Sequence, residues 1–278
     1  YAEKDKRIKL VTNDEFVGQI ENYNRAMSLI SADSVYVKMI QADDWMFPNC
    51  LERMVDLAER HPQVGVVGAY QLSESFISCQ GLAYHTPVVP GREVVRMYLF
   101  DNSKFLFGQP SALMYRADLV RARRPFYDLH SRQEDTDAAI DLLEHNDFGF
   151  VHQVLTFRRM SNQSITSSIL KFTPYLMHDF ITLVKYGQRF LSLDEYRRCY
   201  AHTGGLYCRF LGGQYLTNRD QAFWDYHRRG LESVGFELTT AKLLRWAGSA
   251  IVDWTFNPKR SLGRLAASAK RQAGGPRG

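Results

Sequence analysis

The chain has 278 residues, of which 45% are hydrophobic and 23% are charged, and its formal net charge is +5. This apolar content is enough for a full core, in one large domain or in one domain with an appendage, and it excludes a disordered protein. All six charged residues after position 258 are basic, so the rest of the chain is close to neutral, which argues against a nucleic-acid-binding fold.

The four cysteines lack the paired spacing of a zinc site, which predicts buried, reduced thiols in a cytoplasmic protein. They are Cys50, Cys79, Cys199 and Cys208. No stretch approaches the ~18 apolar residues of a spanning helix, and no charged and then apolar leader opens the chain. The first four residues are typical of the end of a helix, so we expect the natural start of the domain to lie upstream.

Strands and helices are predicted to alternate along the first part of the chain. Apolar patterns predict strands at residues 7–11, 35–41 and 64–70, and helical spacing predicts a helix at residues 21–29. A second helix is predicted to begin at Pro48 and to end before His61 and Pro62. Its predicted apolar face holds Leu51, Met54, Val55 and Ala58. This alternation is typical of an α/β fold with a mainly parallel central sheet flanked by helices.

The pattern changes near position 168. Before it we expect a loop with room for a short hairpin at residues 72–90. Helices are predicted at residues 92–100 and 135–144, and strands at residues 113–115 and 148–157. After it the strand signals stop, and helices are predicted at residues 175–190, 194–216, 220–234 and 241–254. We therefore predict three parts: an α/β domain at 1–168, a helical region at 169–258 and a basic flexible tail at 259–278.

Asp43 and Asp44 follow a predicted strand and precede Trp45. Carboxylates at the carboxyl end of a strand lie where open α/β sheets bind ligands. One or two of them suffice for a divalent cation that also holds a nucleotide diphosphate. Either aspartate is equally suited to cap the helix that begins near Pro48. The spacing alone leaves both interpretations open.

A second acidic group, Glu134, Asp135 and Asp137, opens a predicted helix. Acids in a first helical turn interact favourably with the helix dipole, which is a purely structural role. A carboxylate placed there can also act as a general base toward an acceptor hydroxyl. Further along, Arg158 and Arg159 follow a strand and precede the polar run 161–164. They can hold a phosphate, or the run can be a plain surface loop.

Taken in order, these segments resemble a family 2 glycosyltransferase of the GT-A fold that lacks its N-terminal strands. The resemblance rests on YAEKDKRIKLV (1–11), NYNRA (22–26), QADDW (41–45), GQPSALMYRADLV (108–120), PFYD (125–128), Glu134-Asp135 and FGFVHQVLTFRR (148–159). The family's DXD motif falls at residues 41–44, with Gln41 in place of its first aspartate. Met160 or Ser161 stands where many relatives have a histidine, and the Q-x-x-R-W motif of processive synthases is missing from the sequence.

The resemblance implies an inverting transfer of a sugar from a nucleotide-diphosphate donor to a hydroxyl of a saccharide or lipid-linked acceptor. It implies that Asp43 and Asp44 bind Mg²⁺ or Mn²⁺ and the diphosphate, with Arg158 and Arg159 beside the phosphates. Asp135 becomes the catalytic base, and Glu134 shapes the same site. Such enzymes act in bacterial polysaccharide biosynthesis, in the cytoplasm or peripherally at the inner face of the membrane.

Two other interpretations fit the sequence. One is a truncated or non-catalytic relative that binds a saccharide or a phosphate. The other is a membrane-surface adaptor that uses the basic tail and the helices around Trp246 and Trp254.

Overall fold

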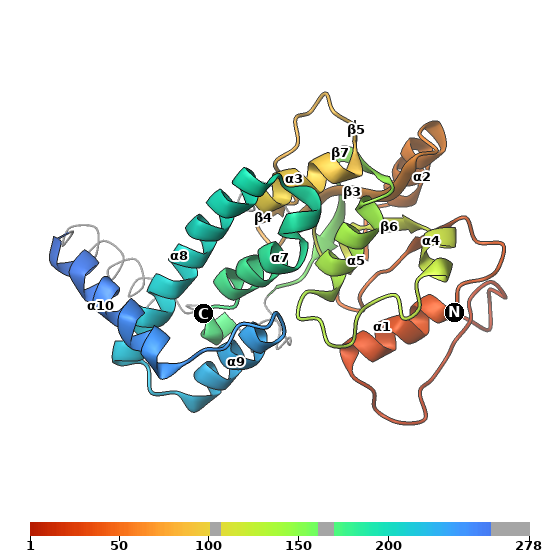
Figure 1. Ribbon diagram of the computed structural model, residues 1–278. Coiled ribbons are helices and arrows are strands. Elements are labelled where there is room, and N and C mark those ends of the chain that lie inside the picture. Colours follow the sequence, from red (N-terminus) through yellow and green to blue (C-terminus); the bar gives the residue numbers. More distant parts are fainter. Residues whose placement is uncertain (101–106, 161–169, 257–278) are drawn as a thin grey trace. The chain divides into compact units, whose positions relative to one another are not determined.

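The computed structural model describes residues 1–100, 107–160 and 170–256 (Figure 1). The chain divides into two compact units, Tyr1–Ser161 and Asn162–Gly278. The first is mixed α/β and the second is helical among its described residues. Residues 161–164 and the basic tail lie outside the described residues, as does position 168, where the composition changes.

The described residues of the first unit form a seven-stranded sheet with the central order β1-β6-β3-β7-β2. Its two long strands, β3 (Val64–Ser73) and β7 (Asp147–Arg158), pair in parallel along most of their length. The short strands around them are β1 (Tyr36–Lys38), β2 (Trp45–Met46), β4 (Phe76–Ser78), β5 (Val88–Val89) and β6 (Met114–Arg116). All of these short strands pair antiparallel, so the sheet is mixed rather than mainly parallel.

The core of the first unit lies where α2 (Cys50–Arg60) packs on the two long strands. The run of buried residues along β3 shows that both faces of this strand are covered, because successive side chains point to opposite faces. The other helices are α1 (Gln19–Ser28), α3 (Gly91–Phe100), α4 (Ala117–Ala122) and α5 (Glu134–Leu143), with the short 3₁₀ turn η1 (Pro110–Ala112). The helices α3 and α5 contact each other and also contact β7 and β3 respectively.

Most of the predicted elements in this unit are confirmed, including the hairpin formed by β3 and β4. The predicted strand at residues 7–11 is wrong, because Leu10 is 83% exposed and no described strand pairs with this segment. A short apolar run without a neighbouring strand gains neither ladder hydrogen bonds nor burial. The predicted face of α2 is partly wrong: Met54 and Ala58 are buried, but Leu51 is exposed, and Cys50 and Leu57 take its place in the core.

The second unit contains the predicted helices, as α7 (Tyr175–Phe190), α8 (Leu193–Thr217), α9 (Gln221–Glu232) and α10 (Thr240–Phe256), after the short turn η2 (Leu170–Phe172). Sequence signals fix two starts: Ser192 and Glu195 form a capping box on α8, and the Asp220 side chain caps α9. Aromatic and aliphatic side chains fill its core, and the fully buried His227 bonds the Tyr207 hydroxyl at 2.8 Å.

Candidate active site

The two aspartates Asp43 and Asp44 lie in the turn between β1 and β2, at the end of the sheet where β3 and β7 both finish. The backbone N–H of Asp44 donates to the carbonyl of Gln41 at 3.1 Å, which closes the turn. Neither aspartate caps α2, because the residue at its N-cap is Asn49 and no side chain bonds there. The helix-cap interpretation of the pair is therefore wrong.

Asp44 is held from two other segments of the first unit. Its Oδ2 accepts a hydrogen bond from the Gln109 side chain, and its Oδ1 accepts one from the backbone N–H of Arg159 at 3.2 Å. Burial raises the pKa of the Asp44 carboxyl, the Ser111 side chain opposes this shift by hydrogen bonding, and the negative charge of Asp43 adds to it. The carboxylate therefore lies in a half-buried site where burial outweighs the groups that favour its charged form.

Pairing between β2 and β7 brings Arg158 and Arg159 to the same turn. Trp45 lies opposite Phe157 in the ladder, and the two rings stack with centroids 3.8 Å apart and planes 9° from parallel. The next residue along β7 is Arg158, whose positive charge lowers the pKa of Asp44, although burial outweighs it. The structure thus brings Asp43, Asp44 and this arginine pair together at one edge of the sheet.

Lys38 is a charged residue of this region that the motif reasoning does not identify. Its ammonium group donates to the backbone carbonyls of Ser111 and Leu113. Burial lowers the pKa of Lys38 to about 8, although the thiols of Cys50 and Cys79 and the Asp44 carboxylate favour its charged form. The sequence signal that could have identified Lys38 is a lysine inside an otherwise apolar strand pattern.

Tyr23 of α1 connects the aspartate turn with the acids of α5. Its hydroxyl accepts hydrogen bonds from the side chains of Gln41 and Gln19. Burial raises the pKa of Tyr23, and the charges of Glu134 and Asp135 raise it further. The same ring therefore contacts the turn that carries Asp43 and Asp44 and feels the electrostatic field of Glu134 and Asp135.

Glu134 and Asp135 lie in the first turn of α5, whose N-cap residue, Gln133, makes no side-chain capping bond. Asp135 Oδ1 accepts the backbone N–H of Thr136 at 2.7 Å. Burial raises the pKa of Glu134 to about 7, and the charge of Asp135 adds to this shift. Burial also raises the pKa of Asp135. A carboxyl with a pKa near neutrality is suited to take a proton at physiological pH.

Asp137 has a different role from its two acidic neighbours. It is 5% exposed, and its Oδ2 accepts the Ser131 hydroxyl at 2.8 Å. This contact ties the preceding loop to the helix. Of the three acids in the predicted group, Asp137 therefore has a structural partner, while Glu134 and Asp135 carry the raised pKa values.

Two buried tyrosines lie beneath Asp135. Tyr115 of β6 and Tyr127 are both fully buried, burial raises the pKa of both hydroxyls, and the charge of Asp135 adds to each shift. The side chain of Asn24 holds the backbone of Tyr127 from both sides, accepting its N–H and donating to its carbonyl, each at 2.7 Å. This fixes the PFYD segment (125–128) against α1.

Among the described residues, few clustered side chains could bind a divalent cation. No group of three or more His, Cys, Asp or Glu side chains in the described ranges could hold a metal ion. Asp43 and Asp44 fit the smaller requirement of Mg²⁺ or Mn²⁺, which takes one or two carboxylates and fills its other positions with substrate phosphates and water. None of the described helices is long and apolar enough to cross a membrane.

Comparison with solved structures finds a likeness to the crystal structure of S. aureus TarS 1-349 in complex with UDP-GlcNAc. The TM-score is 0.51 and the identity is 14%, and the match covers 83% of this chain and 68% of that chain. At this identity the likeness concerns the fold, which is GT-A-like. A search of the curated proteins found no match.

The family comparison concerns the first part of the chain. The model described as glycosyl transferase family 2 matches residues 1–123, which include α1, the aspartate turn, β3 and β6. Residues 1–123 therefore match glycosyl transferase family 2, and the fold of the chain is GT-A-like.

Proposed function

We propose that the protein is an inverting glycosyltransferase that moves a sugar from a nucleotide-diphosphate donor to an acceptor hydroxyl. The observation that carries this proposal is the contact series from Asp44 and Gln41 through Tyr23 to Glu134 and Asp135. It supports one cleft with a diphosphate end, formed by Asp43, Asp44, Arg158 and Arg159, and a proton-accepting end at Asp135. The acceptor in this proposal is a saccharide or a lipid-linked glycan, the classes expected from the sequence.

In the proposed reaction the acceptor oxygen attacks the anomeric carbon from the side opposite the diphosphate. The bond from this carbon to the diphosphate oxygen breaks, and the diphosphate leaves with the electron pair, so the configuration inverts. Asp135 accepts the proton of the acceptor hydroxyl, and Glu134 shapes the same site. Arg158 and Arg159 position the phosphates. A bound Mg²⁺ or Mn²⁺, held by Asp43 and Asp44, would supply charge stabilisation for the departing diphosphate.

The donor to test first is a UDP-linked sugar, since the similar S. aureus protein was solved with UDP-GlcNAc. All the residues given a role lie within 1–168, so we assign the transfer chemistry to that part of the chain. We also propose that the enzyme serves bacterial polysaccharide synthesis in the cytoplasm, with a peripheral contact of the tail at the inner face of the membrane.

Replacing Asp135 by Asn tests the catalytic base. The side chain keeps its size and loses its basicity, so we expect transfer to fall by about 10² to 10⁴ while donor binding and the circular-dichroism spectrum stay unchanged. Release of nucleoside diphosphate from a panel of nucleotide sugars, with and without acceptor saccharides, measures the rate. Asp56→Asn on the exposed side of α2 is the matched control. A variant that turns over near the wild-type rate would move the base elsewhere, and an intact chain without any turnover would favour a non-catalytic relative.

Replacing Asp43 by Ala tests the cation site. Loss of one of two carboxylates should weaken Mn²⁺-dependent binding of a nucleoside diphosphate by about tenfold, measured by titration calorimetry with and without EDTA. Asp56→Ala should bind like the wild type. An unchanged dependence on Mn²⁺ would remove Asp43 from the cation site.

A further inference from the structure

A cavity lies between α1 and the segment that follows α4, apart from the proposed donor site. Its volume is about 400 Å³, and Val120 and Phe126 give it an apolar wall. The charged lining comprises Glu21, Arg25, Arg121, Arg123 and Arg124. None of the residues assigned to the donor diphosphate or to proton transfer lines this arginine groove. It therefore needs its own explanation.

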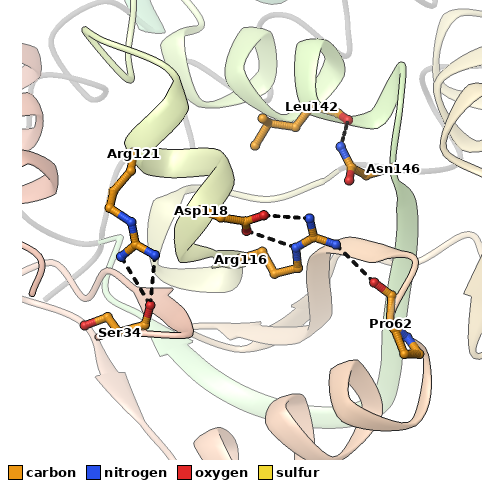
Figure 2. A network of polar contacts seen from close by, with 7 residues as sticks. All are labelled: Ser34, Pro62, Arg116, Asp118, Arg121, Leu142 and Asn146. Carbon is orange, nitrogen blue, oxygen red and sulfur yellow. Dashed lines mark hydrogen bonds and ion pairs between the residues drawn. The ribbon is translucent and has the colours of Figure 1, made fainter. Parts of the chain in front are cut away.

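Two of the four arginines have partners. Arg121 donates to the backbone carbonyls of Ser31 at 3.1 Å and Ser34 at 3.2 Å, and Figure 2 shows its guanidinium turned onto Ser34. These acceptors are neutral, so Arg121 keeps its full charge. Arg123 pairs with Asp141 at 2.7 Å, which offsets its charge. Figure 2 also shows Arg116, outside this cavity, paired with the carboxylate of Asp118 through two hydrogen bonds.

The other two arginines differ. Within the described ranges, the guanidinium groups of Arg25 and Arg124 have no hydrogen-bond or ion-pair partner, and both residues are exposed. Glu21 is the one carboxylate among the described lining residues, and it lies one helical turn before Arg25 without an ion pair between them in that part of the chain. Arg25 and Arg124, both without such a partner in the described ranges, thus line the same cavity as Arg121.

We propose that the arginine groove binds a phosphate-bearing group. Guanidinium groups present planar forks that match the oxygens of phosphate, and a lining in which arginines outnumber the single carboxylate Glu21 suits an anionic ligand. The volume is within the usual range of small-molecule sites, and the apolar wall suits the organic part of a phosphate ester. The ligand is either a free phosphate compound or a phospholipid headgroup, which share this chemistry.

Calorimetric titration of the full chain with sodium pyrophosphate in EDTA tests binding without a divalent cation. The variant Arg25→Gln/Arg124→Gln should bind about tenfold or more weakly, because it loses two charge-assisted contacts. Glu21→Gln should bind more tightly, because it removes the one lining carboxylate. The matched control is Arg53→Gln/Arg60→Gln, which removes the same charge from α2, beside a different cavity. Because pyrophosphate also suits the proposed donor site, the titrations are repeated in the Arg158→Gln/Arg159→Gln background, where the loss caused by Arg25→Gln/Arg124→Gln should persist.

Sedimentation with vesicles containing phosphatidic acid, against vesicles of phosphatidylcholine alone, separates the two sources. If Arg25→Gln/Arg124→Gln loses vesicle binding and keeps its pyrophosphate affinity, the groove binds a lipid headgroup. If it loses pyrophosphate affinity and keeps vesicle binding, the groove binds a free phosphate compound. The proposal is overturned if this variant matches the wild type in both assays. It is also overturned if Arg53→Gln/Arg60→Gln loses as much binding, since overall charge would then explain the effect.

Discussion

At the scale of single residues, burial of charged groups is the main property of the proposed site. Asp44, Glu134 and Asp135 have raised pKa values and Lys38 has a lowered one, and burial is the largest cause in each case. A protein gains no stability by keeping carboxyl groups in such surroundings. Groups of this kind cluster at sites where charge is used, which is the physical reason to favour catalysis or ligand binding here.

The raised pKa of Glu134 makes stability depend on pH. Below the ordinary glutamate pKa of 4.5, the folded and unfolded chains both carry the proton, so burial has no cost. As the pH rises from there to about 7, the unfolded chain ionises first, and the free energy of unfolding falls. Glu134→Gln should therefore raise the free energy of unfolding by about 1 kcal/mol at pH 8 and change it little at pH 4.

Urea unfolding at the two pH values measures this difference. Glu52→Gln, an exposed substitution on α2, is the control and should change stability equally at both. A gain for Glu134→Gln that is the same at pH 4 and pH 8 would show that ionisation of Glu134 is not its cause.

At the scale of elements, the position of the site residues depends on how short strands pair. The two-residue strand β2 aligns Trp45 with Phe157, and this pairing brings the aspartate turn to Arg159. In the second unit, the close approach of two helices depends on one glycine. A Cβ on Gly212 of α8 would lie 2.4 Å from the backbone carbonyl carbon of Trp246 in α10, whereas a Cβ on Gly213 would meet nothing within 4 Å.

These neighbouring glycines form a matched pair. Gly212→Ala should lower the free energy of unfolding by about 2 kcal/mol, because α8 and α10 must move apart. Gly213→Ala should raise it by about 0.5 to 1 kcal/mol, because alanine is the better helix former. Thermal and urea unfolding of the two variants give both numbers. Equal effects of the same sign would show that the helices are not in backbone contact at Gly212.

At the scale of the whole molecule, the chain has a separate core in each of its two units, and its net positive charge comes from its last residues. One core lies between α2 and the sheet, and another lies among the C-terminal helices. The net positive charge comes from six basic residues after position 258, outside the described residues. Segments of this charge are attracted to anionic lipid surfaces by about 1 kcal/mol per basic residue.

Removal of residues 259–278 tests the membrane contact. The shortened chain should bind vesicles containing anionic lipid at least about tenfold more weakly than the intact chain at low salt, and the difference should shrink as salt is added. Vesicle sedimentation at two salt concentrations measures it, with neutral vesicles as the control. Equal binding of the two chains would exclude the tail as the membrane contact.

The sequence by itself determined the elements that have strong local signals. β3, β7 and α7 to α10 follow from apolar runs, helical spacing and caps. The sequence also predicts the candidate site residues, which are Asp43, Asp44, Glu134, Asp135, Arg158 and Arg159. The match to the family model covers residues 1–123, which hold most of the segments on which the resemblance rests.

Only the tertiary structure decided the pairing of the short strands, the coil at residues 7–11 and the partners of the acids. Gln41 and Tyr23 meet across 18 positions, and Asp44 meets Gln109 across 65. Such contacts depend on which segments the sheet brings together, and local sequence patterns do not encode this. The same holds for the arginine groove, because Arg25 and Arg124 lie far apart in the sequence and share a cavity only after α1 has packed against the segment that follows α4.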